Sequence, residues 1–492
     1  MKKILVLILA YNAEKHIVGV LNRLPAGLWQ NSEYTTEVVV IDDCSQDNTS
    51  QVARAHFSGF LHPVHLLRNA VNQGYGGNQK IGYTYAVQQG FDAVVMLHGD
   101  GQYPPEKIPD MVAPLIRGEA DAVFGSRMLH KKDALAGGMP LYKFIGNMVL
   151  TAIQNAMLGS RLSEFHSGFR AYSVAALRQI PFQCNSNVFH FDTDIIIQLV
   201  DKGLTIREIP IPTHYGDEIC RVNGPRYALD VMLSTLLSRV QKLGIFYAPK
   251  FDYEQTVVYF DKTDFASNHR FALDRIPPGA SVLDISCDGG VLTPYLRAKG
   301  CGITYCGADL SDKNRAKYDA AHAMDLNNPD FTVLGNEHYD VVLLLDVISH
   351  ITAPERFLAA LHAWSSPEKQ QVIVTTSNIA FFIQRIMLFI GQFNYGKRGT
   401  LDMTHTRLFT TSSLKRILVN AGFNLVELEG IPAPFPLAVG KNTLGRGLIK
   451  LNGWLITLSK SLFSYQIAAI AKPRPTLEWL VVQAMKEGAQ VT

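Results

Sequence analysis

The stretch Ile4-Leu5-Val6-Leu7-Ile8-Leu9-Ala10-Tyr11-Asn12 is an apolar run that ends in polar side chains, and the run Val38 to Ile41 ends in the same way at Asp42-Asp43. Uninterrupted aliphatic runs of this length are typical of strands buried on both faces of a parallel sheet. Residues directly after such strands lie at the carboxyl edge of the sheet, where open α/β sheets bind ligands. The two stretches therefore predict an α/β fold with a binding site at that edge.

The alternation of short apolar runs and helix-length segments continues through the first half of the chain. It indicates parallel strands joined by crossover helices. Further strands are predicted at Val64 to Leu67, Ala93 to Leu97 and Ala122 to Gly125, and helices at Gln79 to Gln88 and Pro105 to Arg117.

A second α/β alternation begins near residue 281. A chain of 492 residues is also too long for one hydrophobic core. We therefore expect two domains, 1–250 and 256–492, separated near Ala248 to Gln255 after a long helix at Tyr227 to Leu243. In the second domain we expect strands at Ser281 to Ile285, Ile303 to Ala308, Val341 to Leu345 and Gln371 to Thr375, and helices at Leu292 to Lys299 and Pro354 to Trp364.

Composition limits the partners and the compartment. A net charge of +3 gives no argument for a nucleic-acid partner. The six cysteines contain no C-x-x-C pair, which argues against a zinc module and favours the cytoplasm. No apolar run reaches the length of a membrane-spanning helix; the nearest, Ile379 to Gly391, is interrupted by Gln384 and Arg385. We expect a cytoplasmic protein, with peripheral attachment to the inner face of the cell membrane left open.

The segment His98-Gly99-Asp100-Gly101-Gln102 follows the fourth predicted strand and supplies oxygen ligands for a divalent cation. A cation held by Asp100 and Gln102, with Asp43 nearby, would neutralise the diphosphate leaving group of a nucleotide sugar. The glycine-rich stretch around Gly74 and Gly76 would let the backbone approach a ligand before a helix begins. Capping of the following helix is the alternative for Asp43.

Together these segments resemble family 2 glycosyltransferases of the GT-A type, and among them the polyprenyl-phosphate sugar transferases such as dolichol-phosphate mannosyltransferase. The resemblance covers about residues 1 to 245 and implies transfer from a UDP- or GDP-sugar to a polyprenyl phosphate or a growing surface glycan, with inversion. It implies that the D-x-D-x-Q motif binds Mg²⁺ or Mn²⁺, although His98 replaces its first carboxylate and would favour Mn²⁺. It also implies a donor site formed by Ala10, Tyr11, Asn12, Asp42, Asp43, Gly74, Gly76 and Arg127.

The same resemblance implies that Ser167-Gly168-Phe169-Arg170 lines the acceptor side, with Arg170 a catalytic candidate. A hydroxyl acceptor needs a general base, for which Asp192 and Asp194 are candidates, whereas an ionised phosphate needs mainly positioning. Capping of the helix that follows is the alternative for both carboxylates. Arg221 and Arg226 could meet phosphate oxygens, but the family's usual basic ending of this segment is missing.

In the second half, the run Val282 to Gly290 is a strand that ends in an acid and a turn of small residues. This run resembles class I methyltransferases over about residues 256 to 430. The resemblance implies a methyltransferase that acts in the same pathway, on a sugar or a lipid-linked product. It implies S-adenosylmethionine as cofactor, bound by Asp284, Gly289, Asp309, Asp325 and Asp346. Ser286 and Asp288 replace two family glycines, so a degenerate module that does not bind the cofactor is the alternative. The expected fold class is therefore α/β with two Rossmann-like domains, a GT-A fold followed by a class I methyltransferase fold.

Several assignments keep more than one interpretation. His405 could contact the methyl acceptor, act as a base or be structural. Leu444 to Ile470 has helical spacing and either completes a core or lies on a membrane surface, and the same choice applies to Phe381 to Phe393. A nucleotidyltransferase would carry a glycine-rich basic signature after the first strand, which is absent here. A non-catalytic scaffold remains an alternative for the second half.

Overall fold

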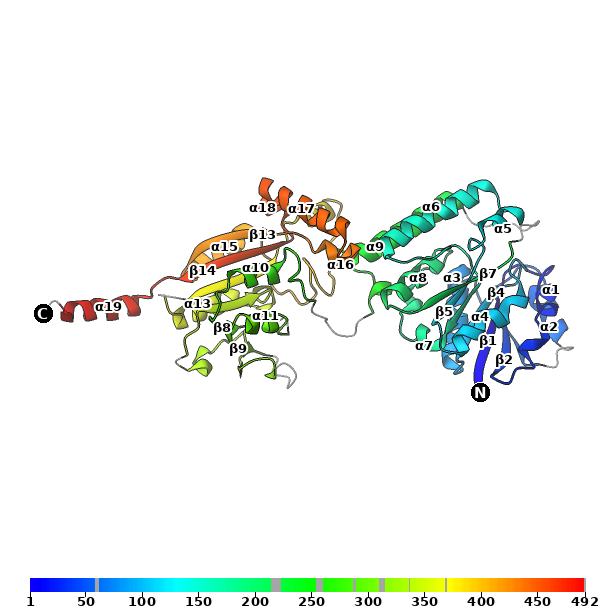
Figure 1. Ribbon diagram of the computed structural model, residues 1–492, viewed down its shortest axis with the longest axis horizontal. Coiled ribbons are helices and arrows are strands. Elements are labelled where there is room, and N and C mark those ends of the chain that lie inside the picture. The colour runs from blue at the N-terminus through cyan, green and yellow to red at the C-terminus, as the bar shows by residue number, and fades with distance from the viewer. Residues whose placement is uncertain are drawn as a thin grey trace. The chain divides into compact units, whose positions relative to one another are not determined.

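The computed structural model describes residues 1–57, 62–213, 223–253, 260–285, 289–308, 315–335, 337–367 and 370–490. The chain forms two compact units (Figure 1). Unit 1 comprises Met1–Arg239 with Ala248–Tyr253, and unit 2 comprises Val240–Tyr247 with Glu254–Thr492. Each unit contains its own seven-stranded sheet between layers of helices.

The sheet of unit 1 has the strand order β3-β2-β1-β4-β6-β5-β7. Its neighbouring strands pair in parallel except for β6, which runs antiparallel to both β4 and β5. The strands are β1 (Lys2–Ala10), β2 (Tyr34–Asp42), β3 (Val64–Arg68), β4 (Ala93–His98), β5 (Ala122–Ser126), β6 (Arg170–Ser173) and β7 (Ile206–Pro210).

The central strand β1 explains why the opening apolar run has no polar interruption. Ile4, Val6 and Ile8 pack into the core on one face of the sheet, while Leu5 and Leu7 pack into the core on the other. Because helices cover both faces of the sheet, the side chains that point to either face are apolar. The strand predicted at Ile4 to Ala10 is confirmed.

The helices of unit 1 connect these strands. They are α1 (Ile17–Asn22), α2 (Thr49–Phe57), α3 (Gly74–Gln88), α4 (Ile108–Ile116), α5 (Lys131–Ala136), α6 (Leu141–Leu158), α7 (Val174–Leu177), α8 (Phe191–Asp201) and α9 (Gly224–Gln241), with 3₁₀ turns η1 (Ala26–Leu28), η2 (Pro105–Lys107), η3 (Phe182–Cys184) and η4 (Pro249–Phe251). The long helices α6 and α9 lie side by side (Figure 1), and Gln154 Nε2 donates a hydrogen bond to Thr235 Oγ1 between them at 3.4 Å.

The sheet of unit 2 has the order β10-β9-β8-β11-β12-β14-β13, with β14 antiparallel to both of its neighbours. The strands are β8 (Ser281–Asp284), β9 (Gly302–Gly307), β10 (Ala320–Ala323), β11 (Val341–Leu345), β12 (Gln371–Ser377), β13 (Phe423–Ile431) and β14 (Gln466–Pro473). The helices are α10 (Asn268–Arg275), α11 (Thr293–Ala298), α13 (Pro354–Trp364), α14 (Phe382–Phe389), α15 (Thr411–Asn420), α16 (Phe435–Val439), α17 (Thr443–Leu458), α18 (Lys460–Phe463) and α19 (Leu477–Gln490), with 3₁₀ turns η5 (Phe331–Leu334) and η6 (Ile348–His350).

One predicted element is wrong in its second part. The helical spacing of Leu444 to Ile470 is realised only by α17 and α18, because the chain then turns into strand β14 at Gln466. β14 is buried and inserts between β12 and β13, so sheet pairing determines its conformation. Among the described residues, no helix has both the length and the apolar character needed to cross a membrane.

Candidate functional site

The carboxyl ends of β1, β2 and β4 meet at one edge of the unit 1 sheet. Ala10 is in register with Asp42, and Leu9 with His98. The loop after β1 is fixed to the loop after β2, since Asn12 N donates to Ser45 Oγ at 2.9 Å and Asn12 Oδ1 accepts from Gln46 N at 2.9 Å. Asn12 adopts a positive φ of 51°. The structure therefore brings the predicted segment Ala10–Asn12 beside Asp42, with the ring of Tyr11 partly exposed.

The carboxylate of Asp43 is engaged with neighbouring groups of unit 1. Its carboxylate accepts hydrogen bonds from Asn69 Nδ2 at 2.7 Å, Gln73 N at 2.8 Å and Gly74 N at 3.0 Å, and the residue is only 3% exposed. Asp43 thus binds the backbone at the start of α3, where amide groups have no partner within the helix. Its part in holding the cation stays a prediction.

The glycines of the glycine-rich stretch also contact another segment of unit 1. Gly74 has a φ of 77°, and a Cβ atom on Gly76 would lie 2.3 Å from the carbonyl oxygen of Ser186. Gly76 N donates to the carbonyl oxygen of Asn187 at 2.8 Å. The close backbone approach that the glycines permit is an approach to the chain's own segment before α8.

Asp42 is also engaged with its neighbours. Its Oδ1 accepts from Ser45 N at 2.8 Å, its Oδ2 accepts from Ser50 Oγ, and Arg68 Nε lies 3.7 Å from Oδ2. These contacts fix the loop after β2 at the sheet edge. The contact of Asp42 with the nucleotide remains a prediction.

Asp100, which was predicted to bind the cation, lies at the same edge of the sheet. It is half-buried, and its Oδ1 accepts a hydrogen bond from Gln102 N at 3.1 Å, while no described residue donates to Oδ2. No group of three or more His, Cys, Asp or Glu side chains among the described residues is arranged to hold a metal ion. A magnesium or manganese ion bound by one carboxylate and by substrate phosphates needs no such group.

His98 points toward a cluster that joins three segments predicted separately. Its Nε2 lies 3.3 Å from the hydroxyl oxygen of Tyr75, and that hydroxyl donates to Asp192 Oδ2 at 2.9 Å. A Cβ atom on Gly168 would lie 2.9 Å from the Tyr75 hydroxyl oxygen and 3.0 Å from His98 Nε2, so a larger residue there would displace these two side chains. Tyr75 therefore connects the segment after β4 to Asp192 of α8.

Arg170 supports this cluster from the interior. It is 1% exposed and donates to the carbonyl oxygens of Ser167 at 2.8 Å, Asp192 at 2.9 Å and Phe165 at 2.8 Å. Burial opposes its charge, but the carboxylate of Asp192 raises the pKa of Arg170. Arg170 thus orders the segment around Ser167, which is itself 3% exposed, instead of presenting its guanidinium to solvent.

Asp192 and Asp194 face different surroundings, although both lie in the first turn of α8. Asp192 accepts from Tyr75 and, at 3.2 Å, from Gln79 Nε2. Asp194 is fully buried and pairs with Lys250 Nζ at 2.8 Å. The capping residue of α8 is His190, whose side chain makes no capping hydrogen bond, so neither aspartate is the N-cap.

Arg127 is held at the carboxyl end of β5 by a buried carboxylate. Its backbone N–H donates to Glu164 Oε2 at 2.8 Å, and its guanidinium pairs with Glu164 and donates to the carbonyl oxygen of His166 at 3.1 Å. Burial alone would raise the pKa of Glu164, but Arg127 lowers it below the usual value. The arginine also borders a cavity of about 210 Å³, whose lining is Ser126, Arg127, His130, Asp133, Pro210, Ile211 and Pro212.

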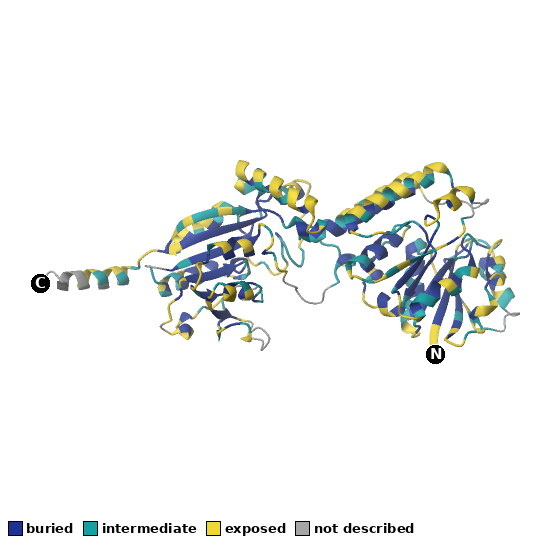
Figure 2. Cartoon of the chain, viewed as in Figure 1, coloured by how far each residue is buried: buried dark blue, intermediate teal, exposed yellow. Residues whose placement is uncertain are grey.

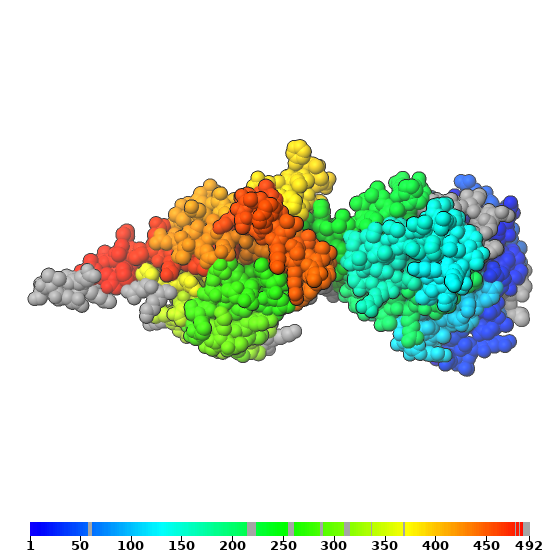
Figure 3. Space-filling view, turned by 45° about the horizontal axis from the view of Figure 1, so that its top comes forward, coloured from blue at the N-terminus to red at the C-terminus, as the bar shows by residue number. Residues whose placement is uncertain are grey.

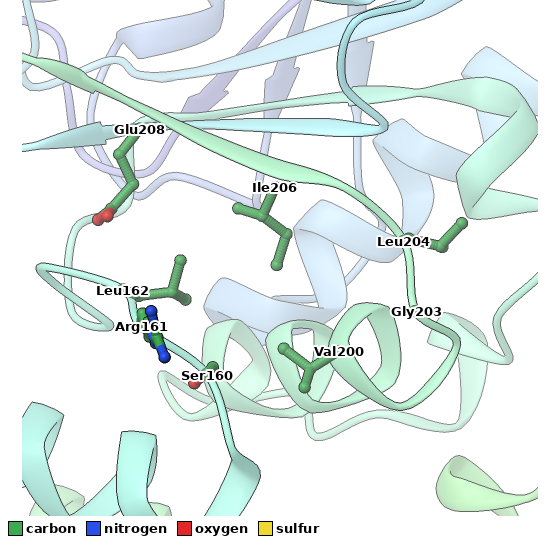
Figure 4. Close-up of a pocket in the computed structure, with 8 residues that line it drawn as sticks. All are labelled: Ser160, Arg161, Leu162, Val200, Gly203, Leu204, Ile206 and Glu208. Atoms are coloured by element: carbon green, nitrogen blue, oxygen red, sulfur yellow. The ribbon is translucent and has the colours of Figure 1, made fainter.

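A second cavity has a different lining. It measures about 340 Å³ and is formed between α8, β7 and the segment after α6 (Figure 4). Its lining consists of Ser160, Arg161, Leu162, Val200, Gly203, Leu204, Ile206 and Glu208, none of which was predicted for the site.

The two arginines predicted to bind phosphate lie in or just after 214–222, a stretch outside the described residues. Arg226 is exposed at the start of α9, where its N–H donates to Asn223 Oδ1 at 3.3 Å. Arg221 lies outside the described residues. The roles of both stay predictions.

In unit 2, the residues expected to bind S-adenosylmethionine contact other side chains of the unit. Asp284 is 2% exposed and accepts a hydrogen bond from the hydroxyl of Tyr318 at 3.1 Å. Lys317 Nζ donates to the carbonyl oxygen of Gly289. A Cβ atom on Gly290 would lie 2.8 Å from the Tyr318 hydroxyl, which shows how closely this ring approaches the turn. Among the described residues, Tyr318 and Lys317 thus contact two groups that the resemblance assigns to the cofactor.

The other predicted cofactor residues are spread around the unit. Asp309 lies outside the described residues, and Asp325 is exposed. Asp346 has a positive φ of 57° and accepts from Asn268 Nδ2 at 2.8 Å and Gln466 Nε2 at 2.7 Å.

His405 lies near the same end of β11 as Asp346. Its ring centroid is 5.0 Å from that of His350, and its Nδ1 is buried. Burial first, and the neighbouring His350 second, lower the pKa of His405. A neutral imidazole at the carboxyl edge of the sheet could accept a proton. His405 could therefore still act as a base or contact the methyl acceptor.

Sequence reasoning missed the residues that hold the unit 1 cluster together. Tyr75 lies between the two singled-out glycines, and Glu164 lies just before the predicted acceptor segment. A buried acid near an arginine is paired in most proteins, but sequence alone does not show which arginine is its partner.

Comparisons with known proteins agree with the division into two kinds of domain. Residues 5–181 match glycosyl transferase family 2, and residues 258–428 match a methyltransferase domain. The UDP-N-acetylglucosamine–dolichyl-phosphate N-acetylglucosaminyltransferase of Methanococcus voltae is 30% identical over 227 residues, covering 44% of this chain and 87% of that protein. The undecaprenyl-phosphate mannosyltransferase of Micrococcus luteus is 28% identical over 210 residues, covering 42% of this chain and 82% of that protein.

Solved structures show weaker similarity. Glucosyl-3-phosphoglycerate synthase from Mycobacterium tuberculosis has a TM-score of 0.37 at 20% identity, covering 48% of this chain and 79% of that one. An S-adenosylmethionine-dependent methyltransferase from Mesorhizobium loti has a TM-score of 0.29 at 13% identity, covering 42% and 98%.

The strand orders of both sheets, the buried central strands and the two family matches together establish the fold class. It is α/β with two Rossmann-like domains, a GT-A fold followed by a class I methyltransferase fold, as predicted. The chain belongs to glycosyl transferase family 2 and carries a methyltransferase domain behind its glycosyltransferase domain.

Proposed function

We propose that unit 1 transfers a sugar from a nucleoside diphosphate sugar to a polyprenyl phosphate, with inversion at the anomeric carbon. The observation that carries the proposal is the position of Asp100. It is half-buried at the carboxyl end of β4, beside the cluster of His98, Tyr75 and Asp192. Two relatives that act on polyprenyl phosphates support the acceptor class.

In this proposal Asp100 holds a Mg²⁺ or Mn²⁺ ion, with Gln102 beside it. The cation supplies charge stabilisation for the departing diphosphate. A phosphate acceptor is already ionised, so the protein needs to position it more than to deprotonate it. Tyr75 and Arg170 keep Asp192 and the segment at Ser167 in place, which we propose as the acceptor side.

The surface of unit 1 supports an acceptor that lies in a membrane. Along α6 the exposed apolar residues recur at helical spacing, and α9 adds a second row. Figure 2 shows exposed positions along both helices. An apolar helix face with a polar opposite side is typical of helices at a bilayer surface. The exposed apolar residues are Leu141, Tyr142, Ile145, Met148, Val149 and Ile153 on α6, and Leu229, Leu233 and Leu236 on α9.

The test is a transfer assay with the intact protein, Mn²⁺, UDP- and GDP-sugars and a polyprenyl phosphate. We expect release of nucleoside diphosphate together with a lipid-linked sugar. Asp100→Asn should lower turnover by at least about 100-fold, since it removes the ionised ligand of the cation. Asp110→Asn is the matched control, because Asp110 is exposed and pairs only with Lys107 among the described residues. No release with any common donor, or full activity of Asp100→Asn, would contradict the proposal.

For unit 2 we infer a non-catalytic role, in preference to methylation of the product. Tyr318 and Lys317 contact Asp284 and Gly289, the residues through which the cofactor was expected to bind. Methylation of the lipid-linked product is the competing function. Methyl transfer from labelled S-adenosylmethionine to that product would favour it.

A further inference from the structure

Unit 2 has a basic apolar surface, which we define as α14, residues 390–395 and α17. Phe389 is 92% exposed, and Trp454 is 58% exposed. Side chains of this size are usually buried, and a run of them at the surface marks a binding face. The exposed apolar residues of the basic apolar surface are Ile386, Leu388, Phe389, Ile390, Phe393 and Tyr395 around α14, and Leu444, Leu451, Trp454 and Leu458 on α17.

The two parts of this surface are joined by α18. The rings of Phe382 and Phe463 lie 5.8 Å apart, and Arg385 Nη2 donates to Ser461 Oγ at 3.3 Å. α18 follows α17 after Ser459. Figure 3 shows the yellow segment after α14 projecting beside the orange α17.

The opposite faces of these helices are packed into the unit, which fixes the exposed faces outward. Met387 of α14 is 2% exposed, and Gln384 is buried and hydrogen-bonded to Thr400. Asn452 of α17 is buried, accepting from Ala433 N at 2.9 Å and donating to the carbonyl oxygen of Phe463 at 2.9 Å. The helices are thus amphipathic elements of a folded unit with one side unpartnered among the described residues.

The charge of the basic apolar surface selects its partner. Neither 378–401 nor 431–466 contains an Asp or Glu, whereas the two stretches contain Arg385, Lys397, Arg398, Lys441, Arg446, Lys450 and Lys460. Lys441 is paired with Asp264, so the exposed Arg446 and Lys450 carry the charge of α17. Apolar and aromatic side chains flanked by cations, in two stretches that themselves contain no Asp or Glu, fit the interface of an anionic bilayer.

We propose that unit 2 docks on an anionic lipid surface through the basic apolar surface. Phe389, Trp454 and their apolar neighbours enter the headgroup region, while Arg446 and Lys450 meet lipid phosphates. The methyltransferase fold then serves as an attachment module, a role that is compatible with the contacts of Tyr318 and Lys317 in its cofactor site. The proposal gives the proposed function a site on the membrane, but it does not require unit 1 to be active.

The experiment is co-sedimentation of the full-length protein with vesicles of phosphatidylcholine, with and without phosphatidylglycerol. Wild type should bind the vesicles that contain phosphatidylglycerol more strongly. Phe389→Glu combined with Trp454→Glu should weaken binding by about tenfold or more, since two large apolar side chains no longer leave water. Arg446→Glu combined with Lys450→Glu should remove the preference for phosphatidylglycerol. Val426→Glu is the matched control, because Val426 is 59% exposed on β13 outside this surface.

Three outcomes would overturn the proposal: no vesicle binding by wild type, equal binding by Phe389→Glu with Trp454→Glu, or the same loss in Val426→Glu. Tyr142→Glu, on α6 of unit 1, tests the rival surface. Loss of binding there alone would place docking on unit 1 and reject the role of unit 2. Sugar transfer in detergent is measured on the same variants, because it reports on the proposed function separately from vesicle binding.

Discussion

The two carboxylates in the first turn of α8 have different partners and therefore different roles. Asp194 is fully buried with Lys250, Ser186 N at 3.0 Å and Ser234 as partners. Asp192 instead orders groups at the sheet edge, since it accepts from Tyr75 and Gln79. Similar positions in the sequence therefore give one aspartate a structural role and leave the other beside the proposed site.

Substituting each aspartate should separate the two roles. Asp194→Asn leaves the ammonium of Lys250 buried without its counter-charge, so we expect the free energy of unfolding to fall by about 3–5 kcal/mol. Asp192→Asn should also lower stability, because the buried guanidinium of Arg170 loses the carboxylate 4.0 Å away. It alone should lower kcat, by up to about 100-fold, because Tyr75 and the acceptor side shift. Urea denaturation and the transfer assay measure the two effects. The reverse pattern would show that the assignments are exchanged.

His166 should make the stability of unit 1 depend on pH. Its Nδ1 is 3.0 Å from the hydroxyl oxygen of Tyr227, and burial lowers the pKa of His166 to about 4. The unfolded histidine titrates near about 6.5, so the native state favours the neutral ring. This contribution is complete above the unfolded pKa and is lost as the pH falls from there toward the folded pKa.

We expect the loss between pH 7 and pH 4.5 to be about 2–3 kcal/mol larger in wild type than in His166→Gln, in which position 166 no longer titrates. Urea denaturation at the two pH values gives the difference directly. Equal pH dependence of the two proteins would mean that His166 is accessible to protons in the folded state.

At the scale of elements, glycine positions show which contacts α3 depends on. A Cβ atom on Gly76 would lie 2.3 Å from Ser186 O and 2.7 Å from Phe191 Cβ, whereas one on Gly19 in α1 would meet no atom within 4 Å. Gly76→Ala should therefore destabilise unit 1 by about 1–3 kcal/mol or more through overpacking. Gly19→Ala should stabilise it by about 0.5–1 kcal/mol through helix propensity. Thermal unfolding of both variants beside wild type tests the pair, and a stable Gly76→Ala protein would mean that the segment before α8 can move away.

Strands with uninterrupted apolar runs could be predicted from the sequence, and strands that contain a buried charged residue or are rich in alanine could not. Ile4 to Ala10 and Val341 to Leu345 are strands as predicted, because their side chains are buried on both faces. β6 escaped prediction because its four residues begin with the buried Arg170. β14 is rich in alanine, a poor strand former, and takes its conformation from the strands on either side.

The candidate site could be predicted in its location but not in the direction of its side chains. The residues that end β1, β2 and β4 do meet at one sheet edge, as strand order requires. Asp43 nevertheless turns toward Asn69 and the start of α3, while Asp100 stays half-exposed. Which of several carboxylates faces the ligand depends on loop hydrogen bonds between distant segments, and a pattern along one chain does not contain them.

At the scale of the whole molecule, the two compact units lead us to propose that 1–250 and 256–492 unfold separately. Calorimetry should then resolve two transitions. GDP or UDP with Mn²⁺ should raise the midpoint of one transition only, since a ligand stabilises the unit that binds it by an amount that grows with its concentration. Asp100→Asn should lose most of this shift. A single cooperative transition that moves as a whole would show that the units stabilise each other.

The two units should also differ in whether they bind their expected ligands, and for unit 2 the probe is S-adenosylhomocysteine. Tyr318 is buried against Asp284 and Lys317 binds Gly289 O, so we expect wild type to give no heat with S-adenosylhomocysteine in titration calorimetry. Lys317→Ala combined with Tyr318→Ala removes both contacts and should bind it. Tyr339→Ala is the control, because the same truncation before β11, at the amino end of that strand, should not create binding. Binding by the double variant alone would mean that the methyltransferase fold retains a cofactor site that its own residues fill. If wild type binds as tightly as the double variant, or if neither protein binds, these two side chains do not keep the cofactor out.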